Sequence, residues 1–478
     1  MGQEIERTGF TAEDFAAFDA RLKAETALLH DWFREAAFST RDRVGGFELE
    51  AWLVDAMGRP APINARVLEA LDDPAVVPEL ARFNIEFNSR PRALHGDGLS
   101  RMLEDLERMY GGCGRVAESL GAGVLMIGIL PSLQEADLKP ENMSEQKRYR
   151  ALNDQVFRQR NGAPLRLNII GNEHLHTLHA DVMLESAATS FQIHLKAAPA
   201  RAVALYNLAQ VLSAPMVALS ANSPFLFGRD LWSETRIPLF EQAVAVGGIA
   251  AAASGPLRRV GFGSGYARAS LFECFQENLE QYPVLLPVCS EAESKQLEHV
   301  RLHNGTIWRW NRPLIGFDAD GTPHLRIEHR VMPSGPTLID AVANAAFFFG
   351  LMQRLGNDDS VVPAELLPFG VARDNFYAAA RDGLDARILW SNQRKLNART
   401  LILEALLPLA REGLEQLTVT PSDQKRFLDI VRRRTETGVT GAAWQRAYVA
   451  RHGRNWEGLT QAYREQQDSG RPVHEWRT

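Results

Sequence analysis

The stretch HLRIEHRV, residues 324–331, has a polar or charged side chain at every second position. In a β-strand, alternate side chains point to opposite faces of the sheet. One face of this strand would therefore present His324, Arg326, Glu328 and Arg330. The opposite face would present Leu325, Ile327, His329 and Val331, which are mostly apolar. A solvated edge strand and a site that binds both a metal ion and phosphate would each produce this pattern.

Other segments show the same alternation and distinguish between these two interpretations. The clearest are FELEAWLV (47–54), FNIEFNS (83–89) and TSFQIHLKA (189–197). Their polar faces would present Glu48, Glu50, Trp52, Asn84, Glu86, Asn88, Ser190, Gln192, His194 and Lys196. For any single strand, an antiparallel sheet with one wet face is the ordinary explanation. The combined set is dominated by Glu, His and Arg, however, and contains a single lysine.

The charges on these faces predict a site for divalent cations. If the strands adjoin, carboxylates about 5 Å apart would repel one another strongly. Divalent cations would relieve that repulsion, and oxygen ligands with one imidazole suit Mg²⁺ or Mn²⁺ better than zinc. Bound cations beside Arg326 and Arg330 would attract a polyanion, for which a nucleoside triphosphate is the obvious candidate. The sequence therefore predicts a metal–nucleotide site on one face of a sheet.

The order of the periodic segments predicts an α+β protein. Residues 11–37 form an amphipathic helical pattern, with Thr11 as its N-cap and Asp14 at the capping-box position. Strand patterns begin at Val44 and alternate with helical ones, and the apolar run AGVLMIGIL (122–130) is typical of a strand covered on both faces. Beyond about Pro336 the periodicity is almost entirely helical. We expect a helical N-terminal extension (1–43), a catalytic domain (44–350) and a helical C-terminal region (351–478).

Composition excludes some classes of function. The chain has 478 residues, a formal charge of −6 and a pI of about 6.1, which argue against binding to nucleic acid. Three cysteines are too few for a disulfide framework, and with no apolar leader at the N-terminus we expect a cytoplasmic protein. Residues 202–228 lack charge but contain scattered polar residues, so we interpret them as a buried helix that continues into a loop, not a membrane span.

The segments with alternating polar side chains resemble motifs of a known superfamily. RIEHR (326–330) resembles the Arg-Ile-Glu-x-Arg signature of the glutamine synthetase superfamily. GFELEAWLVD (46–55) is similar to the Gly-x-Glu-x-Glu opening of the glutamate–cysteine ligases in that superfamily. NIEFNS (84–89) resembles the next acidic strand of those ligases, and SFQIHL (190–195) resembles their metal-binding histidine strand. LSANSPFLFGRDLWSETR (219–236) resembles a segment of bacterial carboxylate–amine ligases. The motifs occur in the family's order and imply an antiparallel sheet curved into a half-barrel, with helices behind it.

The resemblance also implies a role for each matched residue. Glu50 and Glu86 would hold one metal ion, and Glu48, His194 and Glu328 another. The catalytic arginines would be Arg330, on the γ-phosphate, and Arg326, on the acyl phosphate or nucleotide, with Gln192 as a further ATP contact. The implied activity is an ATP-dependent ligase that requires Mg²⁺ or Mn²⁺. It would activate a carboxylate, typically that of glutamate, as an acyl phosphate and join it to an amine such as that of cysteine.

Several further residues are candidates for binding the amino-acid substrate. Arg229 and Arg236 flank the Asn-Ser-Pro segment that contains Asn222, and Arg309 lies in NGTIWRWNRP (304–313). A guanidinium suits an α-carboxylate, although surface salt bridges or packing beside tryptophans would explain these arginines equally well. The histidines of GNEHLHTLHAD (171–181) lack the spacing of a zinc site, and we expect a polar loop at the site entrance.

Two other functions fit the same residues. A phosphotransferase acting on a small guanidino-type acceptor needs the same metals and ATP but no amine. A nucleotide-binding regulatory protein would retain the sheet without turnover, although a degenerate site would be expected to lose at least one ligand. The expected partners are ATP, glutamate and an amine, with no nucleic acid or membrane, and a homo-oligomer is compatible with the sequence.

Overall fold

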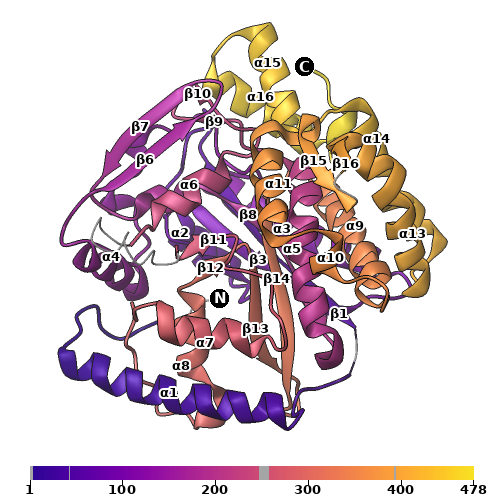
Figure 1. Ribbon diagram of the computed structural model, residues 1–478. Coiled ribbons are helices and arrows are strands. Elements are labelled where there is room, and N and C mark those ends of the chain that lie inside the picture. Colours follow the sequence, from indigo (N-terminus) through magenta and orange to yellow (C-terminus); the bar gives the residue numbers. More distant parts are fainter. Residues whose placement is uncertain (1–3, 42, 247–257, 392–393) are drawn as a thin grey trace.

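A curved antiparallel sheet forms the centre of the molecule in the computed structural model, which describes residues 4–41, 43–246, 258–391 and 394–478 (Figure 1). Among these residues, eight strands join in the order β13-β14-β8-β1-β3-β2, with β4 and β5 also paired to β1. Their bounds are β1 Val44–Val54, β2 Val76–Pro78, β3 Asn84–Asn88, β4 Arg92–Ala93, β5 Gly123–Leu125, β8 Ser190–Ala197, β13 Asn311–Phe317 and β14 Pro323–Pro333. The four segments predicted as strands all lie in this sheet, and the predicted α+β class is confirmed.

Smaller ribbons and many helices surround the sheet (Figure 1). The short strands are β6 Leu165–Ile170, β7 His174–His179, β9 Phe225–Leu226, β10 Arg229–Asp230, β11 Val260–Gly261, β12 Trp308–Arg309, β15 Arg387–Trp390 and β16 Arg394–Asn397. The helices up to the end of the sheet are α1 Ala12–Arg34, α2 Asn64–Leu71, α3 Gly98–Ser119, α4 Lys147–Gln159, α5 Ala202–Ser220, α6 Arg236–Ala243, α7 Phe272–Gln281 and α8 Glu298–Gly305. The later helices are α9 Leu338–Gly356, α10 Pro363–Leu366, α11 Phe369–Asp382, α12 Ala398–Thr400, α13 Leu407–Gln416, α14 Pro421–Thr437, α15 Gly441–His452 and α16 Trp456–Asp468.

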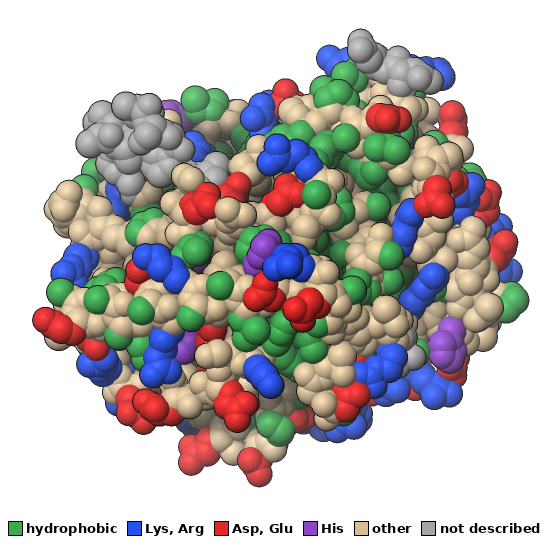
Figure 2. Space-filling view, turned by 60° about the horizontal axis from the view of Figure 1, so that its bottom comes forward, with side chains coloured by type: hydrophobic (Ala, Val, Ile, Leu, Met, Phe, Trp, Pro, Cys, Tyr) green, Lys and Arg blue, Asp and Glu red, His purple; other side chains and the backbone are tan. Residues whose placement is uncertain are grey.

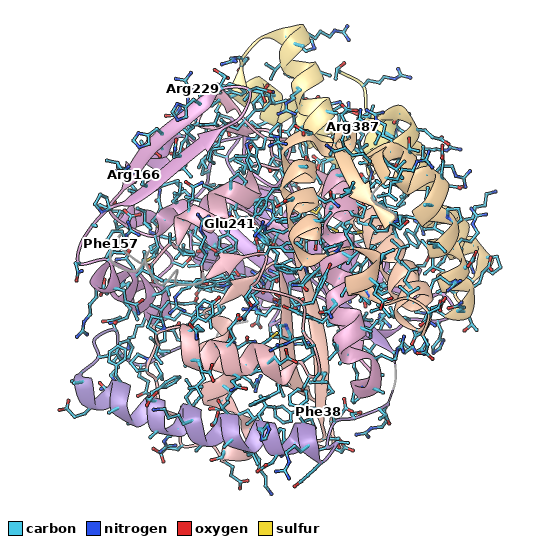
Figure 3. All side chains as sticks on the ribbon, in the orientation of Figure 1. Phe38, Phe157, Arg166, Arg229, Glu241 and Arg387 are labelled. Atoms are coloured by element: carbon cyan, nitrogen blue, oxygen red, sulfur yellow. The ribbon has the colours of Figure 1, made fainter. Side chains whose placement is uncertain are left out.

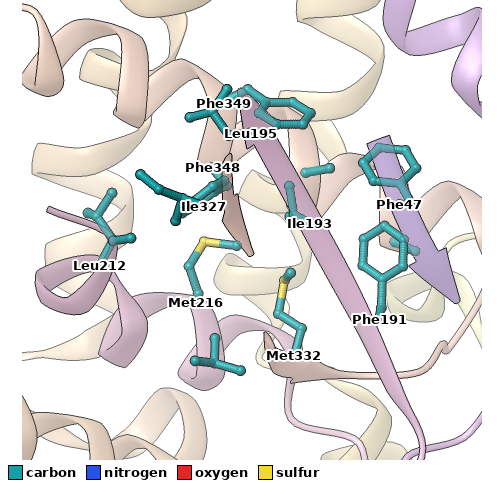
Figure 4. Close-up of a cluster of buried hydrophobic side chains, with 14 of the residues drawn as sticks. Phe47, Phe191, Ile193, Leu195, Leu212, Met216, Ile327, Met332, Phe348 and Phe349 are labelled. Carbon is teal, nitrogen blue, oxygen red and sulfur yellow. The ribbon is translucent and has the colours of Figure 1, made fainter. Parts of the chain in front are cut away.

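Helices α5 and α9 cover the apolar face of the sheet. Figure 4 shows the resulting core, in which side chains of β1, β8 and β14 meet those of the two helices. The labelled members are Phe47, Phe191, Ile193, Leu195, Leu212, Met216, Ile327, Met332, Phe348 and Phe349. Because this face is filled by helices, the polar side chains of the same strands point to the other side, where the site is built.

The N-terminal helix begins as the sequence predicts. Thr11 is the N-cap of α1, its hydroxyl accepts a hydrogen bond from the amide of Asp14, and the Asp14 carboxylate accepts one from the amide of Thr11. This reciprocal pair satisfies two of the amides that a helix leaves without partners at its start. Helix α1 then runs along one side of the molecule beneath α7 and α8 (Figure 1).

Two glycines allow helices α9 and α13 to pack at very short range. A Cβ atom on Gly413 would lie 1.8 Å from the carbonyl oxygen of Gly350, and one on Gly350 would lie 2.2 Å from the carbonyl oxygen of Ala410. Neither position can accept a side chain unless the helices separate. The boundary predicted after residue 350 falls inside α9, on which α13 and α14 pack, and the division of the chain into three parts stays a prediction.

The structure corrects the strand predicted over residues 122–130. Only Gly123–Leu125 forms a strand, and the following buried residues have side-chain partners in place of a neighbouring strand. The carbonyl of Met126 accepts hydrogen bonds from Tyr463 and Gln467, and the carbonyl of Ile127 accepts one from Trp52. An apolar run indicates burial, but long-range partners decide whether its backbone is paired as a strand.

The histidine segment 171–181 is also corrected, because it forms strand β7 of a hairpin instead of a loop. His174 and His176 are exposed and His179 is buried, as the period-two pattern of a strand requires. The region after residue 350, expected to be helical because its periodicity is almost entirely so, also contains the small hairpin β15–β16. The helical stretches Pro199–Ser220 and Leu338–Gly356 are apolar and long enough to cross a bilayer, but 89% and 83% of their most apolar windows are buried inside the protein.

Candidate active site

The register of the sheet brings three predicted ligands together. Glu328 on β14 pairs with His194 on β8, and Glu48 lies on the adjoining strand β1. His194 Nε2 is 3.1 Å from Glu48 Oε1 and 3.8 Å from Glu328 Oε1. One ligand atom from each residue can be chosen so that all three lie within 4.8 Å of one another, and all three side chains are buried.

Two arginines hold Glu328 in its ionised form. Arg312 donates to both carboxylate oxygens, from Nε to Oε2 at 2.7 Å and from Nη2 to Oε1 at 3.0 Å. Arg330 Nη1 lies 3.1 Å from Glu328 Oε2. Burial by itself would raise the pKa of Glu328, but the charges of these guanidiniums outweigh it and hold the pKa well below its usual range. The pKa of Glu48 is also lowered, because the charge of the nearby His194 ring outweighs the effect of burial.

A second group of carboxylates lies on the same face of the sheet, between β1 and β3. Glu50 on β1 faces Glu86 on β3 across the strand pair. The Glu50 carboxylate accepts hydrogen bonds from the amide and hydroxyl of Ser190, at 2.6 and 2.7 Å, and from Gln192 at 3.0 Å. Burial raises the pKa of Glu50, and burial together with the charge of Glu48 raises the pKa of Glu86 to about 7. A bound cation would reverse both effects because it stabilises the ionised carboxylates.

The polar face of the sheet forms one wall of a cavity of about 320 Å³. Five glutamates and five arginines line it: Glu50, Glu79, Glu86, Glu185, Glu298, Arg148, Arg301, Arg312, Arg326 and Arg330. Burial and the neighbouring carboxylates raise the pKa of Glu79 well above its usual value. Burial and the charge of Glu50 raise the pKa of Glu185 to about 8. The cavity thus combines groups that attract cations with groups that attract phosphate or carboxylate.

A β-bulge places Arg330 at this cavity. The register of β14 against β8 shifts by one residue between His329 and Met332, which leaves an extra residue at this point of β14. Arg330 then reaches both Glu328 and the side-chain oxygen of Gln192. Bulges commonly re-aim a side chain beside an active site. Simple alternation therefore assigned the right face to Arg330, while the bulge determines its position along the strand.

Unpaired polar atoms show that the first group fits a metal ion. Among the described residues, Glu48 Oε2 and both ring nitrogens of His194 are buried without a geometrically acceptable hydrogen-bond partner. Buried polar atoms are normally satisfied, and a cation coordinated by carboxylate oxygens and an imidazole would satisfy them. Arg326 lines the cavity, and its Nε atom has no hydrogen-bond partner in the described parts of the chain. These residues could therefore hold a metal ion with a cation beside it.

The residues predicted to bind the amino-acid substrate lie elsewhere. Arg229 is exposed on β10, where it pairs with Glu173, and Figure 3 shows it at the periphery of the molecule. Arg236 is buried and donates to the carbonyl of Val331. Arg309 is buried against Asn278 and Glu277. Asn222 donates to the carbonyl of Ser334 and to Tyr463. None of these four lines the cavity, which the metal-ligand candidates Glu50 and Glu86 do line, so their proposed contact with substrate stays a prediction without geometric support.

Other cavity residues were missed from the sequence. Arg312 could have been found, because the turn after residue 317 predicts a hairpin in which residue 312 faces residue 328. Glu79 follows a strand of only three residues, and Glu185 lies in the 3₁₀-helix Met183–Ala187. Arg148 and Arg301 belong to helices α4 and α8. No local periodicity identifies these four residues, because they lie outside the main strands and only the tertiary fold brings them close to the sheet.

Solved structures share the fold of this protein. No curated protein matches the sequence. Among solved structures, a glutamate–cysteine ligase from Francisella tularensis in complex with AMP matches with a TM-score of 0.52 and 12% identity, over 90% of each chain. A bifunctional glutathione synthetase from Pasteurella multocida matches with a TM-score of 0.49 and 13% identity, over 92% of this chain and 55% of that one. Identities this low show likeness of fold alone.

The family model gives the more specific result. The model described as glutamate–cysteine ligase family 2 matches residues 44–468. The matched range begins at the first residue of β1 and includes every metal-ligand candidate on the sheet. The chain therefore belongs to glutamate–cysteine ligase family 2 and is a carboxylate–amine ligase with a glutamine synthetase-like fold.

Proposed function

We propose that this protein joins the side-chain carboxylate of glutamate to the amine of cysteine or a similar amino compound, in a reaction that consumes ATP. The carboxylate attacks the γ-phosphorus of ATP and ADP leaves. The amine nitrogen then attacks the acyl carbon, loses a proton, and expels phosphate as the amide bond forms. The reaction requires Mg²⁺ or Mn²⁺.

One arrangement supports this proposal above all. The groups Glu48–His194–Glu328 and Glu50–Glu86 lie on a single sheet face that also presents Arg326 and Arg330 to the cavity. Phosphoryl transfer between two anions is limited by charge, so a site for it needs several positive charges arranged before the reactants meet. Divalent ions at these carboxylates would neutralise the phosphate oxygens when bound.

The chain's own residues have distinct tasks in the reaction. Arg330, fixed between Glu328 and Gln192, stabilises negative charge on the γ-phosphate during its transfer. Arg326, with its unpaired Nε, faces the same cavity and stabilises the oxyanion that forms when the amine adds to the acyl phosphate. Arg312 keeps Glu328 ionised and oriented. Arg148 and Arg301 also line the cavity, and their guanidiniums would bind the α-carboxylate of glutamate.

Phosphate release from ATP tests the proposed function. Purified protein is incubated with Mg²⁺ and ATP, first with glutamate alone and then with glutamate and each member of a panel of amines that includes cysteine. Release that requires both glutamate and one amine, with a matching amide detected by mass spectrometry, would establish the reaction. A stable phosphorylated acceptor without amide would instead indicate a phosphotransferase. ATP binding without any release would contradict the ligase assignment and indicate a nucleotide-binding regulatory role.

A further inference from the structure

The N-terminal helix α1 lies outside the region that matches the family model, yet it is joined to the wall of the active site. The match begins at residue 44, whereas α1 ends at Arg34. Helix α1 packs against α7 and α8, and Figure 1 shows the three helices together at one side of the molecule. Helix α8 supplies Glu298, Arg301, Asn304 and Gly305 to the cavity lining. A helix outside the matched region therefore supports a helix that lines the site.

Glu25 makes this connection through three hydrogen bonds to the first turn of α8. Its Oε2 atom accepts hydrogen bonds from the amides of His299, at 2.8 Å, and Val300, at 3.0 Å. Its Oε1 atom is 2.6 Å from His299 Nδ1. Glu25 and His299 are each only 2% exposed. A carboxylate enclosed in this way by one helix end holds that end in place and complements its dipole.

Helix α8 has no local substitute for Glu25. Its N-cap is Leu297, which has a positive φ of 50° and no side-chain oxygen to accept a hydrogen bond from the first amides. Amides at the start of a helix need a partner, and buried amides left without one cost free energy. Phe18, also from α1, packs edge-on against the His299 ring with centroids 5.3 Å apart. The start of α8 thus depends on α1 for both its hydrogen bonds and its packing.

The other end of α8 is bonded to the proposed metal site. The carbonyls of Asn304 and Gly305 accept hydrogen bonds from Arg312, at 3.3 and 3.4 Å. The Asn304 side chain donates to the carbonyl of Pro313 at 3.0 Å, next to Arg312 on β13. Arg312 in turn donates to both carboxylate oxygens of Glu328. A continuous series of buried hydrogen bonds therefore runs from Glu25 through α8 and Arg312 to Glu328.

We propose that Glu25 is a positioning residue of the active site, which holds α8 so that Arg312 presents the Glu328 carboxylate to the bound metal ion. This proposal rests on the metal-site part of the proposed function. It makes the N-terminal extension a required part of the site, although the extension lies outside the matched family region. Loss of the Glu25 carboxylate releases the start of α8, shifts its last carbonyls away from Arg312 and weakens metal binding, even while the protein remains folded.

Binding of Mn²⁺, followed by electron paramagnetic resonance without ATP or amino acids, tests this role. The comparison uses wild type, Glu25→Ala, Glu25→Gln and Leu428→Ala. Leu428 is a fully buried residue of α14, a helix that packs against α9 and α13, so its variant controls for loss of stability alone. All four proteins are studied at a temperature where circular dichroism shows them folded.

We expect the dissociation constant for Mn²⁺ to rise at least tenfold in Glu25→Ala. Glu25→Gln, which keeps one acceptor oxygen, should show a smaller rise, and Leu428→Ala should bind as wild type does. An unchanged dissociation constant in Glu25→Ala would overturn the proposal, as would an equal rise in Leu428→Ala. Turnover is measured separately, so wild-type protein that binds Mn²⁺ but makes no amide would contradict the proposed reaction without affecting the result for Glu25.

Discussion

Glu328 and His194 face each other across adjoining strands, with Glu328 Oε1 3.8 Å from His194 Nε2. This pair lies at the point where metal-binding groups meet the guanidiniums of Arg312 and Arg330. Glu328 has to serve both sets of partners: its oxygens accept hydrogen bonds from arginine and are also available to a cation. Its substitution therefore affects the charge balance of the whole site.

Replacing Glu328 with glutamine should abolish amide formation and ATP turnover, with a loss of at least about 100-fold in kcat. Glutamine has the same size but no charge, so the arginines remain and the cation loses a ligand. Breaking a buried ion pair costs about 3–5 kcal/mol, and we expect a loss of stability toward the lower end of that range. Steady-state kinetics and urea unfolding measure the two effects. Wild-type kcat in Glu328→Gln would contradict the metal assignment.

Arg330→Lys should reduce kcat much more than it changes the KM for ATP, because one terminal nitrogen of Arg330 contacts both Gln192 and Glu328 and leaves the rest of the guanidinium for phosphate, whereas lysine has a single ammonium group for both tasks. Arg229→Ala is the matched control, since Arg229 is exposed on β10 and does not line the cavity. The control should leave kcat and the KM for each substrate within about twofold of wild type. A strong rise in the KM for glutamate in Arg229→Ala would instead restore the role that its sequence position suggests.

Stability of the metal-free protein should fall as pH rises from 6.5 to 8.0. The pKa values of Glu86 and Glu185 are raised to about 7 and about 8, so the folded state binds more protons than the unfolded state in this range. Burial lowers the pKa values of His303 and His329 to about 4 and about 3, so most of their opposite contribution is gained below pH 6.5 and only the remainder of the unfolded-state titration, centred near 6.5, falls within this range.

Thermal unfolding in EDTA measures this dependence. The Tm should decrease between pH 6.5 and 8.0, and this decrease should be smaller when Mg²⁺ is present. In the Glu86→Gln variant the decrease in Tm should also be smaller, even without added metal. A Tm in EDTA that is constant or rises with pH over this range would contradict the assignment of these raised pKa values.

Gly413→Ala should destabilise the fold by about 1–3 kcal/mol or more, because the new methyl group would meet the Gly350 carbonyl between α9 and α13. Gly370→Ala is the control: nothing lies within 4 Å of a Cβ atom there, and alanine favours the helix by up to about 1 kcal/mol. Urea unfolding of both variants tests the packing. Equal stability of Gly413→Ala and wild type would mean that the two helices are not in close contact.

Much of the sheet and its principal site could be predicted because both depend on local alternation. Glu48, Glu50, Glu86, His194 and Glu328 each occupy alternate positions in a strand with an apolar opposite face, so each could be assigned to the polar side. To bring Glu48, His194 and Glu328 together, the fold then had only to place β1, β8 and β14 side by side. The roles of the substrate arginines stay predictions, since a guanidinium near a motif can equally form a structural ion pair, as Arg309 and Arg236 do.

The sequence by itself determined the α+β class, the strands β1, β3, β8 and β14 of the sheet, and the face on which their carboxylates lie. These properties follow from period-two patterns and caps that act over a few residues. Only the tertiary structure decided that Glu79, Glu185 and Arg301 join the cavity, that a bulge positions Arg330, and that Glu25 holds the helix beside Arg312. The physical reason is that these contacts join residues distant in the chain, whose encounter depends on how the whole core packs.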